Sequence, residues 1–236
     1  MKTILHKAAT RGHADHGWLK ANHTFSFAGY HDPSRVHFGV LRVLNDDTVS
    51  GGMGFGAHPH DNMEIITIPL EGQLEHKDSM GNTGVITAGE VQVMSAGTGI
   101  QHSEKNKSAK ESVKLLQIWV FPDKKNVEPR YAQRAFDLDA AKNSFVNIVS
   151  PMGDKDGLNI HQHAWFQLGK FDKDASANYT LKDKSNGVYA FVIKGGVTIN
   201  DQPLGERDGL GITDQDELKI KADSDAQLLL MEIPVS

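Results

Sequence analysis

The sequence predicts an all-β protein in which a similar arrangement of strands occurs twice. Short apolar segments that suit strands recur along the chain, and turns rich in glycine, asparagine or aspartate separate them. Apolar residues at helical spacing are scarce. Segment 191–199 resembles 66–74, and 228–233 resembles 115–120, which indicates an internal repeat. Many short strands joined in this way are typical of a barrel or sandwich in each half.

The first half contains the clearest strand candidates. Strands are expected at 23–30, 38–44, 63–68 and 113–121. Residues 45–47 (Asn-Asp-Asp) indicate a turn. The polar stretch 122–140 has no clear period, so we interpret it as a connector between two domains, 1–135 and 136–236.

Composition excludes several classes of function. The formal net charge of −5 argues against nucleic acid as a direct partner, because phosphate binding needs an excess of Lys and Arg. The chain has no cysteine, which removes disulfides, thiolate metal ligands and cysteine nucleophiles. No apolar run is long enough to span a membrane, and the apolar stretch at the N-terminus is too short for a signal peptide. We therefore expect a cytoplasmic protein that does not associate with a membrane.

Two segments each carry a pair of strong metal ligands separated by one residue. They are His58-Pro59-His60 and His102-Ser103-Glu104. Side chains alternate between the two faces of a strand, so each pair points to one side. Two such strands side by side would direct three imidazoles and one carboxylate into one cavity. That set of ligands suits iron, copper, nickel, manganese or zinc.

Three other patterns are weaker candidates for a site. The glycines at 51, 52, 54 and 56 lack the helix that a phosphate-binding loop requires directly after it. His13 and His16 have no third ligand nearby in the sequence, so a structural role is favoured over a metal site. His161 and His163 are not followed by a His-x-Glu pair, which favours a role at the surface or at the start of a strand.

The repeat also suggests that only the first half carries a metal. When Gly72 is aligned with Gly195, Leu181 and Asp183 fall opposite His58 and His60. Residues 221–224 (Lys-Ala-Asp-Ser) fall where His102 and Glu104 would recur. The second half therefore keeps strand and turn features but loses the ligands.

These motifs resemble those of a known family. Gly52-x5-His58-x-His60-x3-Glu64 looks like the first cupin motif, and Gly97-x-Gly99-x2-His102-x3-Asn106 looks like the second without its usual proline. With segments 11–18, 23–27 and 94–104, the chain resembles the pirin family over nearly its whole length, with bacterial pirin-like quercetin dioxygenases as the nearest group. The resemblance implies a bicupin: a metal-binding cupin barrel at 1–135 and a degenerate cupin barrel without ligands at 136–236.

The resemblance also implies the ligand set His58, His60, His102 and Glu104. Many other cupins use the Glu that follows His-x-His, which is Glu64 here, and strand alternation allows that choice. The pirin pattern favours Glu104 and leaves Glu64 lining the site or supporting a ligand. One divalent metal is expected. Iron(II) is the first choice, and manganese, nickel, copper and zinc are the alternatives.

The activity implied by the resemblance is oxidative ring cleavage of a flavonol such as quercetin. Dioxygen is the second substrate, carbon monoxide is released, and Glu104 accepts the substrate's hydroxyl proton. Phe55 and Met63 are expected to contribute to the substrate pocket. The alternative is a metal-dependent regulator of the pirin type, a transcriptional cofactor that acts through a protein partner.

Overall fold

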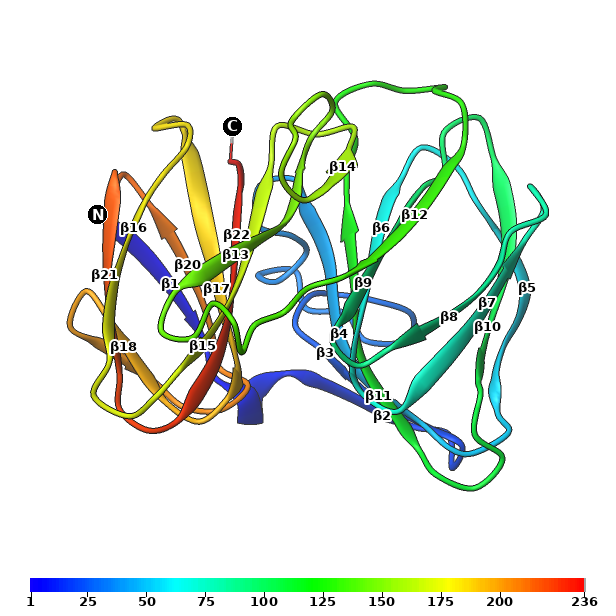
Figure 1. Cartoon of the computed structure of the whole chain (residues 1–236), viewed down its shortest axis with the longest axis horizontal. Helices are drawn as coiled ribbons and strands as arrows, with labels where there is room; N and C mark the ends of the chain where they lie inside the picture. Colours follow the sequence, from blue (N-terminus) through cyan, green and yellow to red (C-terminus); the bar gives the residue numbers. More distant parts are fainter. Residues whose placement is uncertain (236) are drawn as a thin grey trace.

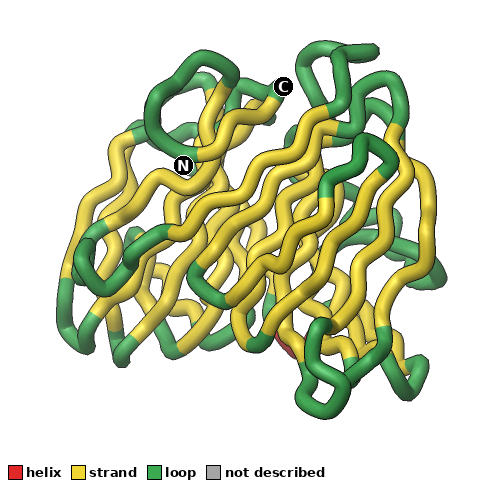
Figure 2. Tube along the Cα trace, turned by 45° about the vertical axis from the view of Figure 1, so that its right-hand side comes forward, coloured by secondary structure: helices red, strands yellow, loops and turns green. Residues whose placement is uncertain are grey.

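The structure, a computed structural model, describes residues 1–235. Apart from one 3-10 turn, η1 (Ala8–Thr10), its regular elements are all strands. They form two barrels that lie side by side, with the C-terminal barrel at the left of Figure 1 and the N-terminal barrel at the right. Figure 2 shows how strands dominate the chain. The predicted all-β fold with two barrels is confirmed.

The first barrel consists of a seven-stranded sheet, ordered β12-β9-β6-β11-β4-β3-β2, and a four-stranded sheet, ordered β5-β10-β7-β8. Its strands are β2 (Gly12–Asp15), β3 (Leu19–His23), β4 (Leu41–Val49), β5 (Gly54–His60), β6 (Glu64–Glu71), β7 (Gln73–Asp78), β8 (Thr83–Thr87), β9 (Glu90–Ser95), β10 (Ile100–Asn106), β11 (Val113–Val120) and β12 (Arg130–Ala135).

The second barrel repeats this plan with sheets ordered β1-β20-β17-β22-β15-β13-β14 and β16-β21-β18-β19. Its strands are β1 (Lys2–His6), β13 (Phe145–Pro151), β14 (Leu158–Ile160), β15 (Trp165–Phe171), β16 (Ser176–Thr180), β17 (Asn186–Lys194), β18 (Val197–Ile199), β19 (Gln202–Leu204), β20 (Gly209–Thr213), β21 (Glu217–Ala222) and β22 (Ala226–Pro234).

The internal repeat detected in the sequence corresponds to the centres of the two large sheets. β6 and β11 lie together in one sheet, as β17 and β22 do in the other. The glycines that follow β6 and β17, Gly72 and Gly195, have φ values of 80° and 77°. Glycine adopts this left-handed conformation without steric cost, which explains why it stands at both turns.

The N-terminal strand departs from the expected division at residue 135. β1 pairs antiparallel with β20, so the chain begins in the second barrel and then crosses to the first. The Lys7 ammonium, 2.8 Å from the Asp208 carboxylate, and the Ala8 amide, which donates to the same carboxylate, help to hold this crossing. The stretch 122–140 is a connector for only part of its length, because β12 lies within it and pairs with β9.

The turn expected at residues 45–47 is wrong. β4 runs through these residues and is hydrogen-bonded to β3 on one side and to β11 on the other. Two neighbouring strands satisfy its backbone groups, which overrides the local preference of Asn and Asp for turns. Asn45 and Asp47 consequently lie on the inner face of the first barrel, and Asp46 points the other way toward Arg11.

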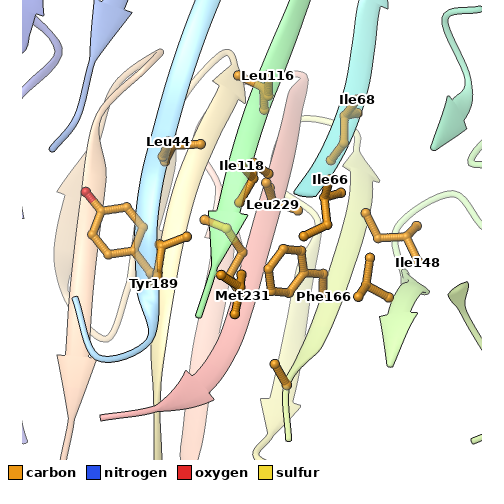
Figure 3. Packing of buried hydrophobic residues seen from close by; sticks show 14 of the residues in the cluster. Leu44, Ile66, Ile68, Leu116, Ile118, Ile148, Phe166, Tyr189, Leu229 and Met231 are labelled. Carbon is orange, nitrogen blue, oxygen red and sulfur yellow. The ribbon is translucent and has the colours of Figure 1, made fainter. Parts of the chain in front are cut away.

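The two large sheets pack face to face across an apolar core (Figure 3). Ile66 and Ile118 of the first barrel meet residues such as Phe166 and Leu229 of the second, and all four are fully buried. Burying an apolar side chain of this size contributes about 1.5–3 kcal/mol. This core fixes which face of β6 and β11 points outward, and their alternate residues therefore face the interior of the first barrel.

Candidate metal centre

The predicted ligands lie on two neighbouring strands of the small sheet. β5 and β10 pair antiparallel with His102 opposite His58 and Ile100 opposite His60. The register shifts between His102 and Glu104, which indicates a bulge at this point of β10. On its other side β10 pairs with β7, where Glu104 lies opposite His76.

The structure brings the three predicted histidines together. Their rings lie 4.4 Å (His58 to His102), 4.9 Å (His58 to His60) and 4.9 Å (His60 to His102) apart between centroids, and one nitrogen of each lies within 4.8 Å of the other two. Nδ1 of His58 lies 2.8 Å from the Gly56 carbonyl oxygen. A carbonyl can only accept, so Nδ1 carries the proton and Nε2 keeps its lone pair for a metal.

A second group shares His102 and adds Glu104 and His76, with ligand atoms again within 4.8 Å of one another. The sequence reasoning missed His76. It is fully buried on β7, and its Nε2 lies 3.1 Å from Oδ2 of Asp78, while its Nδ1 has no partner. The alternation Leu74, His76, Asp78 was the available signal, since it places polar groups at inward positions of a strand.

Several buried polar atoms in this region lack any hydrogen-bond partner among residues 1–235. They include both ring nitrogens of His102 and Oε1 of Glu104. The other oxygen of Glu104 accepts a 2.9 Å hydrogen bond from the Gln117 side chain, which in turn accepts one from Thr67. Leaving buried polar atoms unpaired costs free energy, and a coordinated cation would remove that cost. The donor set therefore fits a divalent transition metal.

The electrostatics of the histidines also suit metal binding. Burial, and then the neighbouring imidazoles, lower the pKa of His102 to about 3 and that of His60 to about 4. Both rings are therefore neutral near pH 7, as metal ligation requires. Burial raises the pKa of Glu104, while His76 and Gln117 act against this effect. A bound cation would favour the ionised carboxylate.

Glu64 does not line this cluster, contrary to expectation. It lies on the same face of β6 as Ile66, toward the second barrel, and its Oε2 accepts a 2.7 Å hydrogen bond from Ser95. Burial raises its pKa to about 7, and the hydrogen bonds from Ser95 and the backbone of His161 act against this rise. Strand alternation relates Glu64 to His58 and His60 only if the strand continues, but β5 ends at His60 and β6 begins at Glu64.

A cavity of about 560 Å³ lies beside the cluster, in the first barrel. Its lining includes His23, Phe27, Tyr30, Asp47 and Phe55. Burial, and then Asp46 and Glu104, raise the pKa of Asp47 to about 8. Phe55, which the sequence analysis expects in the substrate pocket, lines this cavity.

Two further expectations concern the rim of this region. Met63 packs with Ile65 and Met94 and is not among the residues that line this cavity. His13 and His16 line the cavity on exposed positions and do not form a metal group with each other.

Within the described residues, the second barrel contains no group of three potential metal ligands. His163 is exposed and packs edge-on against Trp165, and the backbone of His161 accepts a hydrogen bond from Asp123. Both lie just before β15, as the interpretation of a strand-entry role predicts. None of the helical segments in residues 1–235 is long and apolar enough to cross a membrane.

Known proteins resemble the chain along its whole length. A family described as Pirin matches residues 5–120, and the quercetinase C-terminal cupin domain matches residues 147–233. The chain is 46% identical over 230 residues to a quercetin 2,3-dioxygenase of Escherichia coli K12, covering 98% of each protein. It is 41% identical to a pirin-like protein of Caulobacter vibrioides, covering 94% of this chain and 95% of that protein. The crystal structure of the bacterial pirin YhhW from Escherichia coli in complex with nickel(II) aligns with a TM-score of 0.94 at 44% identity, covering 100% of both chains.

Proposed function

The chain belongs to the pirin family, and from this premise we propose that it is a metal-dependent dioxygenase that cleaves a flavonol such as quercetin with dioxygen and releases carbon monoxide. The name of the Escherichia coli relative, a quercetin 2,3-dioxygenase, supports this reaction, and the histidine and carboxylate cluster supports a metal centre. The cytoplasmic location and the protein partner expected from the sequence stay predictions.

We propose His58, His60, His102 and Glu104 as the metal ligands. The observation that carries this proposal is the burial of His102 with both ring nitrogens unpartnered, beside the unpartnered Oε1 of Glu104. Iron(II) is the metal proposed from the family resemblance. Nickel(II) is the alternative that the Escherichia coli YhhW complex supports, and manganese, copper and zinc also suit this donor set.

When bound, the metal would act as a Lewis acid that favours the ionised substrate hydroxyl and brings it together with dioxygen. The protein's own groups would manage the proton and the water. Glu104 would accept the hydroxyl proton once its Oε1 is released from the metal, while Gln117 continues to hold Oε2. Trp119, which packs against His60 at 4.9 Å, would help to exclude water from one side. In the overall reaction, flavonol and dioxygen yield a depside ester and carbon monoxide.

The test is oxygen-dependent loss of quercetin absorbance, with carbon monoxide monitored, in protein stripped of metal and reloaded with iron(II) or nickel(II). Metal-dependent turnover that is absent in His58→Ala supports the proposal. His163→Ala is a matched control, because this histidine is also one member of a His-x-His pair but lies in the second half. Stoichiometric metal binding without turnover would contradict the dioxygenase and make the metal-dependent regulator the function to test.

A further inference from the structure

The cavity beside the metal centre contains a buried carboxyl group that the protein leaves unpaired. Asp47 is buried, it lines the cavity, and its Oδ1 has no hydrogen-bond partner among the described residues. The other buried polar groups of the lining satisfy each other, since His23 Nδ1 and Asn45 Oδ1 lie 2.8 Å apart. Asp46, the next residue, is paired with Arg11 at 3.1 Å on the opposite face of β4. Asp47 is therefore available to a ligand.

The walls of this cavity are flat and aromatic. The His23 ring stacks on Tyr30 at 6.4 Å with an interplanar angle of 20°, and it also packs against Phe27 at 5.5 Å. Two backbone hydrogen bonds between Phe27 and Tyr30 hold both rings in one tight turn. Gly12 lies directly beneath Tyr30, where a Cβ atom would meet the ring at 2.3 Å. A volume of about 560 Å³ with aromatic walls and one free polar group suits a small planar ligand.

This cavity adjoins the metal centre through two contacts. Phe55, which lines the cavity, lies opposite Glu104 in the pairing of β5 with β10. Phe27, on another wall, packs edge-on against Trp119 at 5.3 Å, and Trp119 packs against His60 at 4.9 Å. The cavity and the predicted ligands are therefore neighbours within the first barrel, linked by Phe55 and by the contact of Phe27 with Trp119.

We propose that this cavity binds the hydroxylated aromatic ring of the substrate that is not held at the metal centre, and that Asp47 pairs with a hydroxyl group on that ring. The inference rests on the proposed function, because it assigns a second part of a flavonol-like substrate to the same site. A hydroxyl group can donate to a carboxylate and accept from a carboxylic acid, so it can pair with Asp47 in either form. The stacked rings of His23 and Tyr30 would favour a planar partner.

The test compares quercetin with 3-hydroxyflavone, which keeps the 3-hydroxyl but lacks the hydroxyls on both outer rings. Binding of each compound to the metal-free protein is measured by fluorescence titration. The native protein should bind quercetin about tenfold or more tightly than 3-hydroxyflavone, as expected for a buried hydrogen bond to a carboxyl group. Asp47→Leu should remove this preference, and Asp47→Asn, whose amide can still pair with a hydroxyl, should keep most of it. Asp139→Asn, at an exposed position, is the control for loss of charge.

The outcomes separate this inference from the proposed function. Loss of the preference in Asp47→Leu supports the inference even if neither compound is turned over with any metal, a result that would contradict the dioxygenase alone. An unchanged preference in Asp47→Leu, or no binding of quercetin to the metal-free protein, would overturn the inference, whether or not the metal-loaded enzyme turns over quercetin.

Discussion

The two barrels share one strand plan but differ in what fills them. Leu74 lies two residues after Gly72, and Val197 lies two residues after Gly195, so the two residues are equivalent. Leu74 pairs with Asn106 and Val197 pairs with Ala222, which aligns strand β10 with strand β21. The inward positions of the first barrel and their counterparts in the second are therefore His76 and Ile199, His102 and Leu218, and Glu104 and Ile220. The second interior is one continuous apolar cluster that includes these three counterparts.

The first barrel divides its apolar interior instead. One small cluster around Leu74 and Leu115 and another around Ile65 and Met94 leave room for buried polar side chains such as Glu104. The same fold thus encloses an apolar interior in one half and a cluster of potential metal ligands in the other, and a few inward positions decide which. Three of the predictions below exchange such positions, and one concerns Glu64, which lies in neither interior.

The largest expected effect follows from giving the first barrel the residues of the second. His102→Leu combined with Glu104→Ile should abolish stoichiometric metal binding and lower turnover by more than about 100-fold, since even residues that only support metal ligands change affinity by 10–100-fold. The metal-free variant should remain folded, because unpaired buried polar atoms are replaced by apolar groups. Metal analysis and thermal unfolding check both parts, and retained metal at one per chain would contradict the account.

The reverse exchange should destabilise the protein. Leu218→His with Ile220→Glu places two polar groups in an apolar interior, which should lower the free energy of unfolding by about 2–6 kcal/mol. Added metal should not restore stability, because Tyr179, not a histidine, lies opposite residue 218. Urea unfolding with and without nickel(II) measures this, and full rescue by the metal would show that two ligands on this fold are enough.

The side chain of Glu64 is buried, but it lies in the interior of neither barrel. Its pKa is raised to about 7, chiefly by burial, so the folded state holds its proton more tightly than the unfolded state does. The stabilising contribution of the protonated Glu64 carboxyl group is therefore complete below the ordinary pKa of 4.5 and is lost as the pH rises through 7. Relative to the Glu64→Gln variant, the free energy of unfolding of the native protein should fall by about 3 kcal/mol between these pH values. Parallel pH profiles for the two proteins would argue against a neutral Glu64.

The smallest predicted effect concerns His76. Replacing it by Ile, its counterpart in the second barrel, removes a buried imidazole beside His102 and Glu104, which should weaken metal binding by about 10–100-fold without unfolding the protein. Competition with a chelator measures the affinity. Unchanged affinity would mean that His76 only fills space.

Much of this account could be predicted from the sequence. Strand patterns and glycine turns identified the all-β fold, and the paired segments 66–74 and 191–199 identified the repeat. Strand alternation placed His58, His60 and His102 together, because the alternation of side chains is a local property of any strand.

The misses depend on pairing between distant strands. The position of β1 in the second barrel depends on its pairing with β20, which no local pattern reveals. The sequence alignment placed residues 221–224 opposite His102 and Glu104, whereas the strand register places Leu218 and Ile220 there, because the connections in the two halves differ in length. His76 was overlooked for a similar reason, since only the β7 to β10 pairing sets it opposite Glu104.

The most direct test of the central claim is a crystal structure of metal-loaded protein, with anomalous diffraction recorded at the absorption edge of the metal. The account predicts one peak per chain, in the first barrel, about 2.0–2.2 Å from a nitrogen of each of His58, His60 and His102 and from an oxygen of Glu104. A peak bound by other side chains, or a peak of equal height in the second barrel, would contradict it.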